Sequence, residues 1–158
     1  MSVASDYDHY AEQVVTPGKT VELSLNMLRN PPAANGEHPL LHIEHLGDTN
    51  DSFQNDSIAK ANAKTQVGED NTKWSKAKYN ELTEKNRETL IKYAVRKIEH
   101  VYRRDGTKVE TVDIAAFMRR LSSDIIWVIW RFAINADNFR EPGSYPDPAT
   151  VKPLAEKS

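Results

Sequence analysis

The sequence predicts an α+β fold, with a β-hairpin near the N-terminus and helices after it. Apolar and polar residues alternate around residues 21–27 and 38–46, as they do in strands with one solvent-facing side. From residue 52 onward, apolar residues recur at helical spacing between turn-forming stretches. The chain has 158 residues, which is enough to bury a real core in one domain.

The N-terminal hairpin consists of two expected strands and a long loop. Val21, Leu23 and Leu25 alternate with polar neighbours and therefore share one strand face. The stretch NPPAANG at 30–36 ends this strand, because proline lacks the N–H that a ladder needs and Asn-Gly favours a turn. A second strand is expected over 38–46, and together the two strands make a long-looped hairpin.

Two helices are expected in the middle of the chain. The first spans residues 52–64 and follows several N-cap oxygens at 48–51. The polar stretch TQVGEDNTK at 65–73 is typical of a surface linker, and the domain could be subdivided there. The second helix starts near Trp74, reaches about Ala94 and is the longest expected helix.

A short second hairpin and a C-terminal helical subdomain complete the expected domain. The turn RDGT at 104–107 separates 108–110 from residues 95–102, which could be either a strand or the end of the long helix. Thr111 is the expected N-cap of a short amphipathic helix. The next helix, 124–135, is apolar around nearly its whole circumference, so other parts of the protein must cover it.

The two ends of the chain lie outside the expected domain, which spans residues 20–141. Residues 1–19 are polar and predict a flexible N-terminal arm. Residues 142–158 are rich in proline and predict a disordered tail. The N-terminus lacks a signal peptide pattern, and no apolar run approaches the roughly 20 residues that span a bilayer, so we expect a cytoplasmic protein without a membrane partner.

The composition argues against several classes of function. With 21 Lys and Arg against 23 Asp and Glu, the net charge of -2 gives no overall basic field for nucleic acid. The absence of cysteine removes disulfides, thiolate metal sites and cysteine nucleophiles. The scattered glycines form no phosphate loop and no Gly-x-Ser-x-Gly elbow. We therefore expect no enzyme, no cofactor and no nucleic-acid partner.

The densest group of metal-ligand residue types lies in the second expected strand. Its members are His38, His42, Glu44 and His45. In an extended strand His42 and Glu44 share one face, whereas His45 points to the other. This alternation prevents a local three-ligand site, so we expect no metal here.

The aromatic block of the last helix has two interpretations, a buried core helix or a surface that anchors another chain. Trp127 and Trp130 point one way, while Ile129 and Phe132 point more nearly another, and a small subdomain has little material to bury both sides. Interfaces are enriched in Trp and Arg. The candidate partner-binding residues are Trp127, Trp130, Arg131, Phe139 and Arg140.

Two segments carry a family resemblance. Residues 93–141 (YAVRKIEHVYRRDGTKVETVDIAAFMRRLSSDIIWVIWRFAINADNFRE) run strand, Asp-Gly turn, strand, Thr-capped short helix and aromatic helix, and end in Asn-Phe-Arg. This order resembles the C-terminal half of tail assembly chaperones of long-tailed bacteriophages and prophages, with their D-x-G turn, S/T-capped helix and terminal N-F-R. The stretch EHLGDTNDSFQN between a strand and a helix is similar to that family's G-x-x-N-x-x-[FY]. The resemblance covers about residues 20–141.

The resemblance implies a non-enzymatic chaperone made in the cytoplasm of the host bacterium. Such a protein coats the tape measure protein, keeps it soluble, helps to recruit tail tube subunits and then leaves. Two other classes stay open: a virion structural protein at the head–tail joint or on the capsid, and a small DNA-binding regulator. The regulator is the weaker alternative, because SDIIWVIWRF is too apolar to read base edges. The oligomeric state also stays open, a homo-oligomer included.

Overall fold

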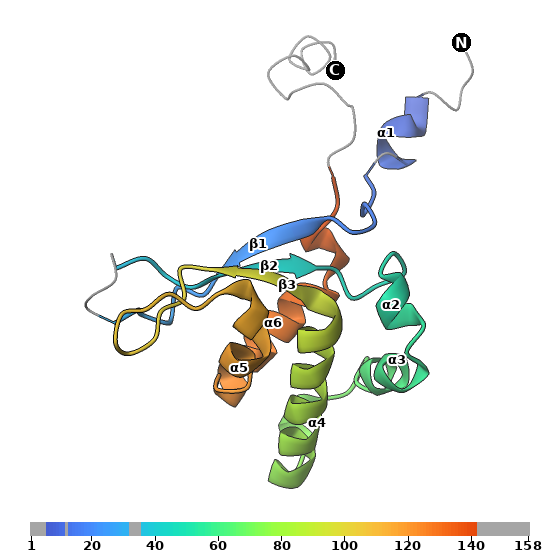
Figure 1. Ribbon diagram of the computed structural model, residues 1–158. Helices are drawn as coiled ribbons and strands as arrows, with labels where there is room; N and C mark the ends of the chain where they lie inside the picture. The colour runs from blue at the N-terminus through green and yellow to red at the C-terminus, as the bar shows by residue number, and fades with distance from the viewer. Residues whose placement is uncertain (1–5, 12, 32–35, 142–158) are drawn as a thin grey trace, which may run out of the picture.

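The computed structural model describes residues 6–11, 13–31 and 36–141. In this part of the chain a small sheet lies across a group of helices that extend from one side of it (Figure 1). This arrangement confirms the expected α+β class. The expected tail at 142–158 lies outside the described residues, so its disorder stays a prediction. No helix in the described part combines the length and the apolar character that a membrane crossing requires.

The sheet contains three antiparallel strands in the order β1-β2-β3. They are β1 (Thr20–Ser24), β2 (Leu40–Glu44) and β3 (Val95–Glu99). Leu41 and Ile43 of the central strand are fully buried, and their neighbours along the strand are half-buried. The predicted N-terminal hairpin is therefore confirmed, although β1 ends three residues before the alternating pattern does.

The predicted second hairpin is confirmed close to its turn, where Val109 N also donates to Val101 O at 2.7 Å, but β3 itself forms its ladder with β2 and not with residues 108–110. After β3 the chain makes a narrow turn, in which Arg103 N donates to Thr107 O at 2.7 Å. A single isolated bridge joins Tyr102 to Lys108. The backbone groups of β3 form hydrogen bonds with the central strand β2, so residues 108–110 pair only with the residues next to the turn.

The helix expected over residues 52–64 is divided into α2 (Asp51–Gln54) and α3 (Ser57–Lys64). The side chains of Asn50 and Asp56 each accept a hydrogen bond from the backbone N–H three residues further on, at 3.2 and 3.0 Å. Asp56 thus starts a new helix inside the expected one, since a short acidic side chain competes with the helical hydrogen bonds of the backbone.

The longest helix is α4 (Lys76–Thr89), which continues through a π-helical turn, η3 (Leu90–Ala94), directly into β3. Ser75 caps its start, with Ser75 Oγ accepting from Lys78 N at 3.1 Å. The chain after Ala94 is therefore a strand, which decides between the two interpretations that the sequence left open.

The C-terminal helices are α5 (Ile114–Met118), preceded by the 3-10 turn η4 (Thr111–Asp113), and α6 (Ser123–Ile134). The predicted N-cap at Thr111 is wrong, because no side-chain oxygen caps either η4 or α5. Thr111 Oγ1 lies instead 3.5 Å from Ile98 N, so its hydroxyl faces the sheet.

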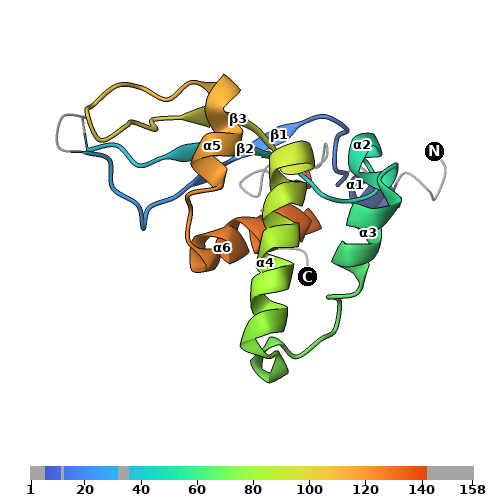
Figure 2. The ribbon, with the colours of Figure 1, turned by 60° about the horizontal axis from the view of Figure 1, so that its bottom comes forward.

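Helix α6 lies against α4, which crosses it in Figure 2. Leu46 N donates to Ala133 O at 2.9 Å and thereby attaches α6 to the chain that follows β2. Six residues of α6 are buried: Ile125, Ile126, Trp127, Ile129, Trp130 and Ala133. The expected cover for this apolar helix is thus supplied mainly by the protein itself.

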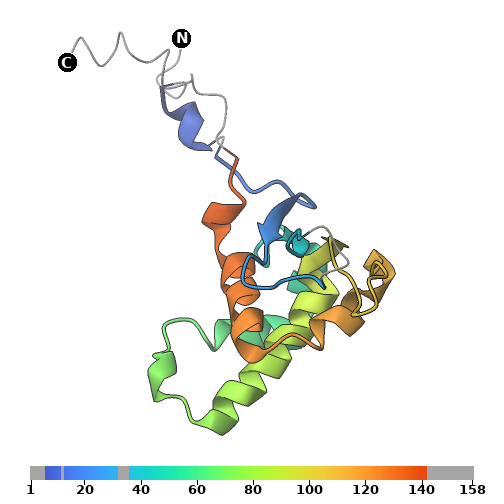
Figure 3. The same cartoon turned by 90° about the vertical axis from the view of Figure 1, so that its left-hand side faces the viewer.

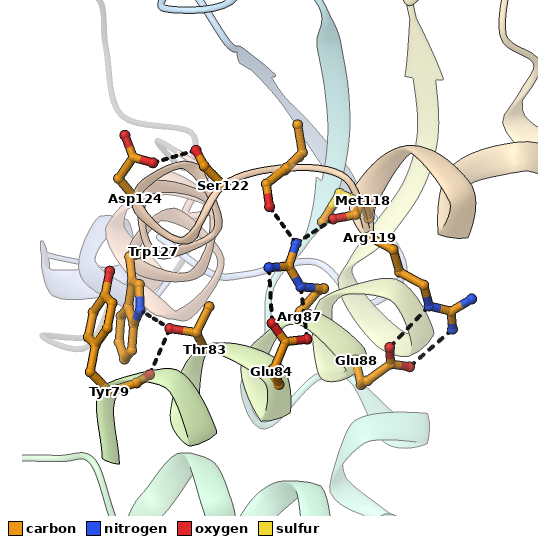
Figure 4. A network of polar contacts seen from close by, with 11 residues as sticks. Tyr79, Thr83, Glu84, Arg87, Glu88, Met118, Arg119, Ser122, Asp124 and Trp127 are labelled. Atoms are coloured by element: carbon orange, nitrogen blue, oxygen red, sulfur yellow. Dashed lines mark hydrogen bonds and ion pairs between the residues drawn. The ribbon is translucent and has the colours of Figure 1, made fainter. Parts of the chain in front are cut away.

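A polar network attaches α4 to α5 and to the turn before α6 (Figure 4). Arg87 Nη1 donates to Met118 O at 2.8 Å and to Leu121 O at 2.7 Å. Glu84 accepts from the other side of the same guanidinium, which is buried. A cation is favourable at the C-terminal end of a helix, because the last carbonyls have no partner within the helix.

The expected N-terminal arm contacts the domain over its last residues. It contains a short helix, α1 (Asp8–Ala11), which lies beyond the rest of the structure and buries no residue (Figure 3). Further along, Glu141 N donates to Val14 O at 2.8 Å, and Lys19 Nζ lies 2.6 Å from Glu141 Oε1. The two ends of the described chain therefore meet at this point.

Candidate partner-binding site

Three of the five candidate residues, Trp127, Trp130 and Arg131, line one open cavity of about 490 Å³. The cavity lies between α6 and the segment that runs from α2 to the 3-10 turn η2 (Asn71–Lys73). We call it the tryptophan cavity. Its apolar lining also includes Leu46, Phe53, Ala63, Val67, Trp74 and Ile134.

Trp127 forms the side of the tryptophan cavity that adjoins α4, where ring contacts and one hydrogen bond hold its indole in place. Its indole stacks on Tyr79, with ring centroids 5.7 Å apart and planes inclined by 16°, and it contacts Trp74 at 5.6 Å. Trp127 Nε1 donates to Thr83 Oγ1 at 2.8 Å, and Thr83 in turn donates to the carbonyl of Tyr79 (Figure 4). Only 7% of Trp127 is exposed, and its single polar atom is satisfied.

Trp130 is buried more deeply, with 3% of the residue exposed, but its side chain forms no hydrogen bond in the described part of the chain. The third indole of the cavity, Trp74, donates to Glu69 Oε2 at 2.7 Å. Trp74 and Trp127 both donate to side chains, so in the described part of the chain Trp130 carries the one indole donor of this cavity without a protein acceptor.

The rim of the tryptophan cavity is positively charged. Three cations there have no ion-pair partner in the described part of the chain: Lys60, Lys64 and Arg131. Of the two acids on the rim, Glu69 is engaged by Lys78, 3.0 Å away. The hydrogen bonds from Lys78 and then from Trp74 hold the pKa of Glu69 below its usual range. Asp48 is the other acid, so cations exceed free acids at the rim.

The wall opposite α6 is attached to the rest of the protein at two polar points. Gln66 and Asn86 exchange amide hydrogen bonds of 2.9 and 3.1 Å. Tyr93 Oη donates to Asp56 Oδ2 at 2.6 Å, which raises the pKa of Tyr93. These contacts hold the residues after α3 beside α4 and keep the cavity open toward α6.

Phe139 and Arg140 do not line the tryptophan cavity. The ring of Phe139 is buried against His45 and Phe132, with centroid distances of 5.0 and 5.5 Å. Arg140 is exposed and forms an ion pair with Asp137 at 3.2 Å. In the described protein these two residues fasten the end of the chain, and the structure does not bring them to the other three candidates.

Sequence reasoning missed the second wall of the cavity. It interpreted residues 65–73 as a surface linker and Trp74 as the start of a helix, whereas Val67 and Trp74 line the cavity together with Trp130. Two signals were available. A tryptophan directly after a polar linker needs a cover, and Val67 is an isolated apolar residue within that linker.

The four metal-ligand residue types are not brought together, and no group of three such residues able to hold a metal occurs in the described ranges. Each has a separate neighbour. His38 lies 2.8 Å from the carbonyl of Leu28, and His45 lies 3.4 Å from the carbonyl of Ile134. His42 lies 3.3 Å from the carboxylate of Glu99, and Glu44 lies 2.9 Å from the guanidinium of Arg96. His42 and Glu44 lie two residues apart on β2, whereas His38 and His45 lie outside this strand.

Comparisons with protein-family models, with curated proteins and with solved structures find no match for this chain. The functional argument therefore rests on the tryptophan cavity. Its lining contains no histidine, serine or threonine. It combines apolar surface, an indole donor without a protein acceptor and a cationic rim, and aromatic residues and arginine are the residue types enriched at protein interfaces.

Proposed function

We propose that this protein is a tail assembly chaperone of a long-tailed bacteriophage. In this proposal it acts in the cytoplasm of the host bacterium, binds the tape measure protein through the tryptophan cavity and helps to recruit tail tube subunits. The observation that carries the proposal is the convergence of Trp127, Trp130 and Arg131 on one open apolar cavity. The order of motifs across residues 20–141 supplies the class of partner.

A helical client suits the shape and chemistry of this cavity. Helices bind in grooves through apolar side chains one turn apart, and a volume of about 490 Å³ accommodates several such groups. Tryptophan and arginine are the residue types that most often dominate binding energy at interfaces. The alternative of a DNA-binding regulator is disfavoured, because α6 would have to enter a groove and most of it is buried.

Co-expression with the tape measure protein of the same phage tests the proposal. We expect the tape measure protein to be soluble and to co-purify with the chain only when both are made together. Ala63→Phe fills the cavity and should abolish the co-purification, whereas Ile58→Phe, also on α3 but outside the cavity and 75% exposed, should not. Thermal melts of both variants establish that they fold.

Three outcomes would overturn the proposal. The tape measure protein could be soluble without the chain, or Ala63→Phe could capture it as well as the unmodified protein does. The third outcome is the presence of the chain in purified virions, which would favour a structural protein at the head–tail joint or on the capsid, because an assembly chaperone leaves before the particle is complete.

A further inference from the structure

We infer that the tryptophan cavity selects an acidic amphipathic helix, with apolar side chains entering beside Trp130 and carboxylates meeting the rim. The inference rests on the proposed function in that it uses the same site, and it adds the chemistry of the bound segment. Three independent features of the cavity support it: apolar surface left exposed, cations left unpaired and an indole donor left free.

The exposed apolar surface defines the inserted part of the partner. Val67 is 80% exposed on one wall of the cavity, and Ile134 is 44% exposed on the other. Large side chains of this kind on opposite walls of an open cavity gain from being covered together. A partner that places leucine-like side chains between the two walls covers both, and a helix does so with one face.

The cations define the flanks of the partner. Lys60 and Lys64 lie one turn apart on α3, where like charges at this spacing repel each other. Arg131 stands on the opposite wall, so positive charge borders the cavity on both sides. Carboxylates on either side of an apolar face would relieve the repulsion and pair with each wall.

The indole N–H of Trp130 adds a polar requirement to the bound segment, beyond its apolar side chains. An N–H group that loses water on binding without gaining an acceptor costs free energy, so a partner that covers the Trp130 N–H binds more tightly when it brings an acceptor. A glutamate or aspartate side chain next to the inserted apolar residue supplies one. Another polyanion, nucleic acid, carries no apolar side chains for the walls to cover and is treated as an alternative outcome of the test.

Fluorescence anisotropy with three probes tests the inference on the full chain. The first is a synthetic helical peptide with leucine on one face and glutamate on the flanks, the second replaces every glutamate by lysine, and the third is single-stranded oligo(dT). We expect the acidic peptide to bind at least about tenfold more tightly than either of the others, since like charges oppose association. Added salt should weaken its binding.

Variants then locate the binding. The double variant Lys60→Glu/Lys64→Glu should weaken the acidic peptide by about tenfold or more, whereas the matched variant Lys73→Glu/Lys76→Glu, on exposed lysines outside the cavity, should leave it nearly unchanged. Trp130→Phe removes the indole donor and should weaken binding by about 2- to 12-fold. Thermal melts accompany each variant.

Equal binding of the acidic and lysine peptides would overturn the inference, as would tighter binding of oligo(dT) or equal losses in the two double variants. These failures differ from a failure of the proposed function. If the tape measure protein is captured while the acidic preference is absent, only the inference falls. If the acidic peptide binds at the cavity while the tape measure protein is never captured, only the proposed function falls.

Discussion

The two sides of α6 differ in how their polar groups are satisfied. On the side that faces α4, Trp127 donates to Thr83, and Arg87 bonds two carbonyls and a carboxylate. On the side that faces the tryptophan cavity, the Trp130 donor and the nearby Arg131 have no partner among the described residues. The first side is therefore satisfied within the chain, whereas on the second side Arg131 is exposed and the Trp130 donor has no protein acceptor among the described residues.

The largest expected effect comes from breaking the complete side. Arg87→Met leaves the carbonyls of Met118 and Leu121 buried without donors, which should lower the free energy of unfolding by about 2 to 5 kcal/mol in a urea titration. Arg119→Met is the matched control. Arg119 pairs with Glu88 at an exposed surface, so its replacement should change the free energy of unfolding far less than that of Arg87. Equal losses in the two variants would contradict this difference.

Trp127→Phe and Trp130→Phe sharpen the comparison directly. Both lose the same atoms from buried positions, but only Trp127→Phe also loses a hydrogen bond, so it should be the less stable by about 0.5 to 1.5 kcal/mol. Since both indoles are buried, alanine at either position should cost about 3 to 5 kcal/mol, so phenylalanine is the informative change. A less stable Trp130→Phe in chemical denaturation would refute the assignment of the two sides.

Gly47→Ala tests how tightly the edge of the tryptophan cavity is packed. A Cβ atom at Gly47 would overlap the ring of His45, which contacts Phe139 and the carbonyl of Ile134. We expect a loss of about 1 to 3 kcal/mol in the free energy of unfolding. In a protein that already carries His45→Ala, the same Gly47→Ala change should lower the free energy of unfolding by less, because the ring that the Cβ atom overlaps is gone. A neutral Gly47→Ala would mean that the ring moves aside freely.

The smallest expected effect is a pH dependence at the wall opposite α6. Hydrogen bonds from Ala59 N and then from Tyr93 Oη lower the pKa of Asp56, so the folded state favours its charged form. This stability is fully present above the unfolded pKa of about 3.9 and is lost as the pH falls through the lower folded pKa. Asp56→Asn keeps a capping oxygen but not the charge, so unfolding curves of the two proteins should differ near neutral pH and converge in acid. A difference that does not vary with pH would exclude this role.

The elements of the fold could be predicted from the sequence where the signal is local. Alternation around Leu41 and Ile43 gave β2, and apolar residues at helical spacing gave α4 and α6. The misplaced features depend on distant contacts. The partner of β3 is β2, more than fifty residues earlier in the chain, and no local pattern distinguishes that edge from the nearby stretch at 108–110.

The candidate site could be predicted only in part, for the same reason. Trp127, Trp130 and Arg131 were found because aromatic and cationic residues on one helix are visible in the sequence. Their common cavity depends on Val67 and Trp74, and the hydrogen bonds between Gln66 and Asn86 of α4 attach this part of the chain to a distant segment. Phe139 is aromatic like the two tryptophans, but its ring is buried against His45 and does not line the cavity.

The direct passage from α4 to β3 has a mechanical consequence. No loop separates the two elements: Val95 N donates to Leu90 O, so backbone hydrogen bonds continue through the π-helical turn into the sheet. Tyr79, which stacks on Trp127, stands near one end of this continuous strut, and the β2–β3 ladder holds the other. A displacement of α4 would therefore reach β3 through hydrogen-bonded backbone, without an intervening loop.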